Sequence, residues 1–124
     1  MLAAFAGERR IRLRHGTTLR RATSIAKNGP NPNFVEPEGN GIAEGFSTAP
    51  ASGPFPMGRP EKYANGKARI FRDEGGPAVL EIDIPESIAR LGLDAGGEIR
   101  FDWGFGLQEL LDAWPLLTKR VIVP

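Results

Sequence analysis

The sequence predicts a fold that contains both helices and strands, because two hydrophobic periods alternate along the chain and a Gly/Pro-rich segment separates the first elements from the later ones. Apolar residues that alternate with charged residues indicate half-buried strands, as Ile11 and Leu13 do between arginines. Apolar residues three and four positions apart indicate helices, as Leu107, Leu110 and Trp114 do.

The first two elements are a strand over residues 11–14 and a helix over residues 19–26. In the helix the apolar residues fall on one face. Thr17 or Thr18 can cap its start, and Asn28-Gly29-Pro30 ends it.

The remaining strands and helices are predicted from the same two spacings of apolar residues and from the residues that end them. Pro85 ends a strand, and Pro115 ends a helix. We expect strands at residues 45–49, 78–84, 98–101 and 121–123, helices at 61–69 and 107–114, and a short turn at 88–91 that Ser87 caps.

Residues 1–124 suit a single compact domain with a modest core. Residues 28–60 hold seven of the eleven prolines together with several glycines, which excludes a long helix there. Phe34, Ile42 and Phe55 make this segment too apolar for a disordered linker. We therefore expect an ordered, loop-rich segment that folds over another part of the domain.

Composition excludes several classes of protein. The chain has no cysteine and one histidine, so a disulfide framework, a thiolate metal site and a histidine-rich metal site are excluded, and we expect no metal. No apolar run approaches the roughly 20 residues that a membrane helix needs. The start of the chain lacks the order of charges of a secretory signal. These features predict a cytoplasmic protein that does not enter a membrane.

Charge is uneven along the chain. Residues 1–27 carry a net charge of +6 and residues 73–124 a net charge of −6. The six arginines of the stretch Arg9–Arg21 can attract phosphate-bearing partners, including nucleic acid. The alternative is that these arginines pair with the acidic second half of the same domain.

The only histidine, His15, is expected where the first strand ends and the free backbone N–H groups of a helix start begin. Such junctions are common ligand sites. The alternative is that His15 caps the turn or bonds a neighbouring loop.

Three motifs follow one another in a familiar order. The first motif is Arg14-His15-Gly16-Thr17-Thr18, followed by a helix that ends in Asn28-Gly29. The second motif is the expected strand Gly45-Phe46-Ser47-Thr48. The third is Glu98-Ile99-Arg100-Phe101-Asp102, preceded by a helix that carries Tyr63-Ala64. This order resembles ADP-ribosyltransferase-fold proteins, most closely the diphtheria-toxin and poly(ADP-ribose) polymerase class. The resemblance implies an α+β fold, namely an ADP-ribosyltransferase-like split antiparallel β-sandwich with short flanking helices. It also implies that NAD is a substrate and that a protein or nucleic acid accepts the ADP-ribose.

The resemblance implies a role for each matching residue. His15 would bond the adenosine ribose of NAD, and the backbone of Gly16 would bind the nicotinamide amide. Tyr63 would stack on the nicotinamide ring. Glu98 would bond the nicotinamide-ribose hydroxyl and stabilise the positive charge that develops as nicotinamide leaves. The same strands contribute Thr17 and Ser47 to the implied NAD site.

Alternatives stay open at the level of the sequence. Glu109 is a second candidate for the catalytic carboxylate, although its spacing is that of an exposed helix residue. Tyr63 can be an ordinary half-buried helix residue, and Lys62 and Lys67 are expected to be solvated. The function can be an NAD-dependent ADP-ribosyltransferase or NAD glycohydrolase, or a non-catalytic module that binds a nucleotide, ADP-ribose or nucleic acid. An RNA 2′-phosphotransferase-like enzyme is a further alternative.

Overall fold

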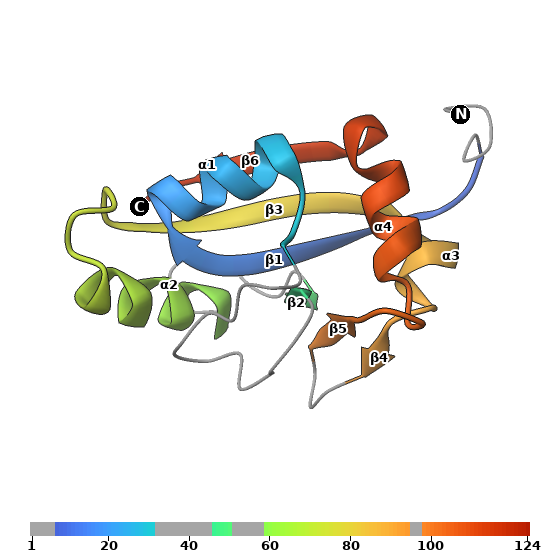
Figure 1. The fold of residues 1–124 in the computed structure, drawn as a ribbon, viewed down its shortest axis with the longest axis horizontal. Helices are drawn as coiled ribbons and strands as arrows, with labels where there is room; N and C mark the ends of the chain where they lie inside the picture. Colours follow the sequence, from blue (N-terminus) through green and yellow to red (C-terminus); the bar gives the residue numbers. More distant parts are fainter. Residues whose placement is uncertain (1–6, 32–45, 51–58, 95–97) are drawn as a thin grey trace.

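The structure is a computed structural model that describes residues 7–31, 46–50, 59–94 and 98–124 (Figure 1). Most of the segment predicted to be an ordered loop, residues 28–60, lies outside these ranges. The strands are β1 (Arg10–Thr18), β2 (Phe46–Pro50), β3 (Pro77–Pro85), β4 (Leu93–Asp94), β5 (Ile99–Phe101) and β6 (Thr118–Ile122). The helices are α1 (Leu19–Asn28), α2 (Arg59–Ile70), α3 (Glu86–Ala89) and α4 (Leu107–Ala113), followed by the 3₁₀ turn Trp114–Leu116.

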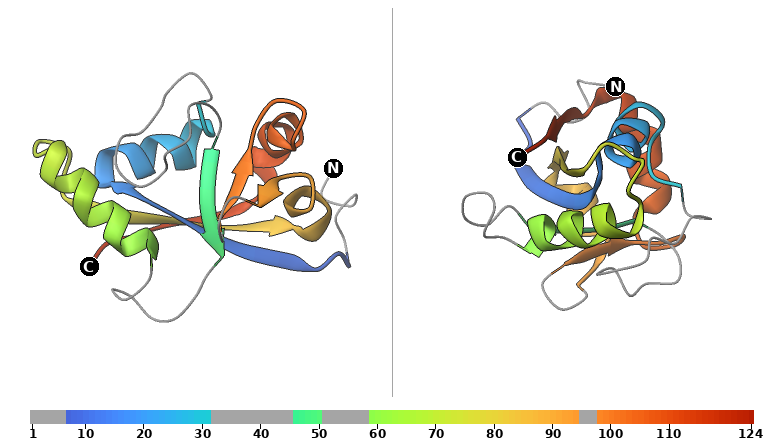
Figure 2. Two further views of the ribbon diagram at one scale, coloured as in Figure 1. Left: turned by 90° about the horizontal axis from the view of Figure 1, so that it is seen from below. Right: turned by 90° about the vertical axis from the view of Figure 1, so that its left-hand side faces the viewer.

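All strand pairs are antiparallel, in the order β4-β5-β2-β1-β3-β6. The ladder between β1 and β3 is long and runs from Arg10↔Pro85 to Thr18↔Pro77. In contrast, among the described residues β2 pairs with β1 only at Leu13 and Arg14, and it also pairs with β5. Figure 2 (left) shows β2 crossing the direction of β1 and β3 steeply. The sheet therefore splits into two parts, β1-β3-β6 and β2-β5-β4, which are joined at this short ladder.

One face of β1 and β3 carries the core. Leu13 on β1 and Leu80 on β3 pack there with Ala22 of α1 and with Leu107 and Leu110 of α4. The alternation of side chains puts Arg14 and Gly16 on the opposite face, against which α2 lies. Apolar burial on one face and charged residues on the other explain the period of two along β1 and β3.

The α+β prediction is confirmed, and apart from the end of the first strand the separate strands and helices lie within a few residues of their expected bounds. The cap of α1 is Thr18, whose hydroxyl oxygen accepts from the Arg21 backbone N–H, and Gly29 ends the helix with a φ of 87°. Among the described residues, no helix is long and apolar enough to cross a membrane.

The prediction for the end of the first strand is wrong. β1 does not stop before His15 but continues through Gly16 to Thr18, because β3 pairs with it over its whole length. His15 therefore lies within a strand, and the helix start lies four residues further on, at Leu19.

One smaller prediction is also corrected, and one strand was not predicted. Ser87 lies inside α3, and the cap residue of that helix is Pro85; the Ser87 backbone N–H donates to the Glu8 carboxylate over 2.7 Å. Leu93–Asp94, which the sequence assigned to no element, forms the short edge strand β4 on β5.

Candidate functional site

Gly16 is the point at which helix α2 approaches the sheet most closely. A Cβ atom added to Gly16 would lie 1.8 Å from the Pro60 carbonyl oxygen and 2.9 Å from the Ala64 backbone nitrogen. No side chain fits there, since both neighbours are backbone. The first turns of α2 therefore rest directly on the strand.

The backbone groups of Gly16 point away from β3. At the two ends of the β1–β3 ladder, Leu19 N–H donates to Gly76 and Glu86 N–H donates to Arg9. Hydrogen-bonded positions alternate along an antiparallel ladder, so His15 and Thr17 bond β3 while Gly16 faces the β2 side. Within the described residues, strand pairing on that side covers only Leu13 and Arg14. Gly16 therefore lies at the edge of β1 where the sheet splits.

A lysine from α2 already contacts this edge. Lys67 Nζ donates to the Gly16 carbonyl oxygen over 2.6 Å, and the Lys67 side chain is fully buried. The prediction that Lys67 is solvated is therefore wrong, whereas Lys62 is exposed as expected. The buried lysine follows Ala64 by three residues, so both lie on the face of α2 that covers the strand.

Glu61 is a second buried charge that the sequence reasoning missed. Its side chain is 1% exposed, and neither of its carboxylate oxygens has a hydrogen-bond partner among the described residues. Arg14 Nη1 lies 3.8 Å from it. The available signal was helical spacing, because Glu61, Ala64 and Lys67 recur at intervals of three residues and share the face of α2 that carries small residues.

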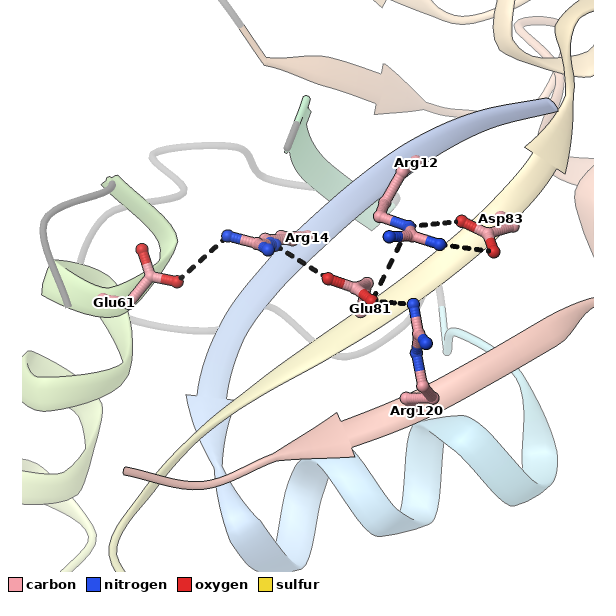
Figure 3. A network of polar contacts seen from close by, with 6 residues as sticks. All are labelled: Arg12, Arg14, Glu61, Glu81, Asp83 and Arg120. Atoms are coloured by element: carbon pink, nitrogen blue, oxygen red, sulfur yellow. Dashed lines mark hydrogen bonds and ion pairs between the residues drawn. The ribbon is translucent and has the colours of Figure 1, made fainter. Parts of the chain in front are cut away.

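Arg14 connects α2 to a network of ion pairs on the face of the sheet opposite the core (Figure 3). Its Nε donates to Glu81 over 3.0 Å, and Arg12 and Arg120 also contact the Glu81 carboxylate. Arg12 in addition holds Asp83 over 2.8 Å. These residues face one another because the register aligns Arg14, Glu81 and Arg120 across three strands.

Glu98 lies in the other part of the sheet. It is 6% exposed and directly precedes β5. The β2–β5 register, continued by one residue, brings Glu98 opposite Ala49, which itself pairs with Arg14. The strand order therefore puts Glu98 on the far side of β2 from β1.

The other predicted site residues lie in four different places. Tyr63 is half-buried on α2, four residues before Lys67 and on the same side of the helix. His15 and Thr17 are buried on the core face of β1, opposite to α2. Ser47 is in β2 and pairs with Arg100 of β5. Glu109 is exposed on α4 and is not part of this cluster.

The arginines of the stretch Arg9–Arg21 have acidic neighbours. Besides the contacts of Arg12 and Arg14, Arg9 lies 3.6 Å from Glu86, and Arg21 Nε donates to Glu74 over 2.7 Å. The Arg21 hydrogen bond lowers the pKa of Glu74, and the Arg12 hydrogen bond lowers the pKa of Asp83. These ion pairs reduce the positive field that the stretch offers to phosphate groups.

Within the described ranges, no three side chains of the kinds that bind metal ions come together. In comparisons with protein-family models, with curated proteins and with solved structures, no match to this chain was found. The site is therefore interpreted from its own geometry.

Proposed function

We propose that the protein binds NAD at the split edge of β1 and cleaves the bond between nicotinamide and ribose, as an ADP-ribosyltransferase or an NAD glycohydrolase. The observation that carries this proposal is the position of Gly16. Its backbone groups point into the split of the sheet, the helix that carries Tyr63 packs on it, and the buried Glu98 lies across β2.

Gly16 would fix the pyridine ring. Its N–H would donate to the oxygen of the ring substituent, and the phenol ring of Tyr63 would stack on the pyridine. His15 and Thr17 flank Gly16 in β1 but are buried on its core face, so in this proposal they hold the Gly16 backbone in place and do not contact NAD directly. Ser47, at the start of β2, would border the same space.

Glu98 would act on the charge that forms during the reaction. The bond between ribose C1′ and the pyridine nitrogen breaks, its electron pair leaves with nicotinamide, and C1′ becomes oxocarbenium-like. A fixed carboxylate beside this centre stabilises the transition state more than the ground state. The oxygen of water, or an oxygen or nitrogen of the acceptor, then bonds to C1′ and loses its proton.

The test of this proposal is the release of nicotinamide from NAD by the wild-type protein and by two glutamate variants. Glu98→Gln keeps the size of the side chain and removes its charge, so we expect NAD affinity to persist and turnover to fall by about 100- to 1,000-fold. Glu109→Gln is the matched control, because Glu109 is exposed on α4, and it should leave turnover unchanged.

Three results would change the assignment. Equal rates for the wild type and Glu98→Gln would remove Glu98 from the reaction. Loss of turnover in Glu109→Gln would transfer the role to that residue. NAD binding at β1 without nicotinamide release, with or without added acceptors, would favour the non-catalytic binding module.

Binding of nucleic acid and RNA phosphotransfer are the weaker candidates. Both depend on cationic side chains that reach phosphate groups, and the described arginines of Arg9–Arg21 largely contact carboxylates instead. An affinity for nucleic acid that falls steeply with rising salt concentration would support the nucleic-acid-binding candidate.

A further inference from the structure

A groove lies along α1, away from the edge of β1 at which NAD is proposed to bind. Its volume is about 440 Å³, in the lower part of the roughly 300–1,000 Å³ range of small-molecule sites. Among the described residues, its walls come from α1, from the residues that directly follow it, and from Glu74 in the turn before β3. Because α1 packs on the core face of the sheet and α2 on the opposite face, the groove is separate from the site at Gly16.

Three polar residues of α1 form one line along this groove. Arg20, Ser24 and Asn28 follow one another at intervals of four residues, which places them on one face of the helix. All three are exposed, and their side chains make no hydrogen bond or ion pair with the part of the chain that the structure describes. A hydroxyl and an amide each offer both a donor and an acceptor, and a guanidinium offers several donors. This line of side chains therefore suits a ligand that carries hydroxyl groups and an anionic group.

The charge of the groove is positive, because two arginines line it with a single carboxylate. Arg21 Nε donates to Glu74 over 2.7 Å, and the Arg21 guanidinium lies 3.7 Å from the centre of the Phe71 ring. Thr18 Oγ1 donates to the same carboxylate over 2.8 Å. Glu74 is thus occupied by these two partners, and Arg20 contributes only a longer-range attraction to it. The guanidinium of Arg20 therefore provides the positive charge that a ligand can meet.

An apolar side chain completes the groove. Ile25 is half-buried and lies on α1 directly after Ser24. Small-molecule sites commonly combine apolar contact area with a few polar groups that fix the orientation of the ligand. The carbon face of a sugar ring would pack on Ile25 while its hydroxyls bond Ser24 and Asn28. A guanidinium can bind a phosphate group through two parallel hydrogen bonds, which favours a phosphate at Arg20.

We propose that this groove binds a small phosphorylated sugar, with Arg20 on the phosphate and with Ser24 and Asn28 on the hydroxyl groups of the ring. This inference is independent of the proposed function, because it uses none of the residues assigned to the NAD site.

The experiment titrates ribose 5-phosphate, ribose and inorganic phosphate separately into the protein while the backbone amide resonances are recorded by NMR. In the wild type we expect ribose 5-phosphate to bind at least about tenfold more tightly than ribose, the usual effect of hydrogen bonds to a charged group, with shifts at Ser24, Ile25 and Asn28. Arg20→Met should lower this affinity by about tenfold, to that of ribose. Arg69→Met, at an exposed arginine of α2, is the matched control and should leave it unchanged.

A second variant separates the sugar from the phosphate. Ser24→Ala should weaken the binding of ribose and of ribose 5-phosphate and leave the binding of inorganic phosphate unchanged. Arg20 and Ser24 are exposed, so both variants should remain folded, which the dispersion of the amide resonances checks in the same spectra.

Three results would overturn the proposal. Inorganic phosphate that binds as tightly as ribose 5-phosphate, with no effect of Ser24→Ala, would mean that the groove holds an adventitious ion only. Unchanged affinity in Arg20→Met, or shifts away from α1, would remove the ligand from this groove. Tighter binding of ribonate, which carries a carboxylate in place of the phosphate, would replace the phosphate with a different anion. None of these results bears on the release of nicotinamide, so the proposed function is tested separately.

Discussion

At the scale of single residues, the lack of a side chain at Gly16 allows α2 to lie directly on β1. We expect Gly16→Ala to destabilise the protein by an amount at the upper end of the roughly 1–3 kcal/mol typical of overpacking, because the added Cβ would meet the Pro60 carbonyl oxygen at 1.8 Å. The free energy of unfolding in urea measures this change.

Gly104→Ala is the control for that measurement. Gly104 has a φ of 84° and no atom within 4 Å of its added Cβ, so its substitution reports backbone strain without a clash. A loss of stability in Gly16→Ala no larger than that of Gly104→Ala would contradict the close approach of α2.

Residues of the site differ in how well the sequence predicted them. Gly16 and His15 were singled out together, but their side-chain directions differ, since neighbours in a strand face opposite sides. Lys67 and Glu61 were missed as site residues because charged residues on a short helix are usually solvated. Only the packing of α2 on a glycine shows that Glu61 and Lys67 lie on the buried face of this helix.

At the scale of elements, α1 is attached to the turn before β3 through Glu74. The carboxylate accepts from Thr18 Oγ1 over 2.8 Å and from Arg21 Nε over 2.7 Å, and the hydrogen bond from Arg21 is the main cause of its lowered pKa. A carboxylate with a lowered pKa in the folded state stabilises the fold above its unfolded value of 4.5. This stabilisation is lost as the pH falls through the folded pKa.

We therefore expect the stability of the wild type to fall as the pH is lowered below about 4.5, with a smaller fall in Glu74→Gln. Asp83→Asn is a comparison at a second carboxylate whose pKa is also lowered. Thermal unfolding followed from pH 7 to pH 3 provides the measurement. Parallel pH curves for the wild type and Glu74→Gln would show that this carboxylate does not couple α1 to the turn.

The spacing of apolar residues along the sequence predicted which strands and helices form better than it predicted where they end. β3 was expected at residues 78–84 and spans Pro77–Pro85, because its alternation of apolar and acidic residues is nearly complete. β1 was expected to be shorter, since His15, Gly16 and Thr17 carry no apolar alternation, and only pairing with β3 extends it. β4 has two residues and no period to detect.

At the scale of the whole molecule, the two parts of the sheet differ in how firmly they are paired. β1 pairs with β3 over its full length and so does β6, whereas among the described residues β2 pairs with β1 at Leu13 and Arg14 alone. We expect amide hydrogens in the β1–β3 ladder to exchange at least about tenfold more slowly than those of β2 and β5, because local opening is easier where fewer pairs must separate.

Hydrogen exchange followed residue by residue by NMR tests this difference. The ladder between β3 and β6 serves as an internal comparison, since it belongs to the more firmly paired part. Uniform protection across all the described strands would mean that the sheet opens as one unit despite its split.

The strand order leaves β4 and β6 as the two outer strands, and this has a consequence for self-association. An outer strand can template further strands from other molecules and so begin aggregation. β4 is two residues long, and β6 carries Lys119 and Arg120, which repel a second copy of the same strand. The same two strands that close the sheet therefore also protect a concentrated solution of the protein against growth of intermolecular β-structure.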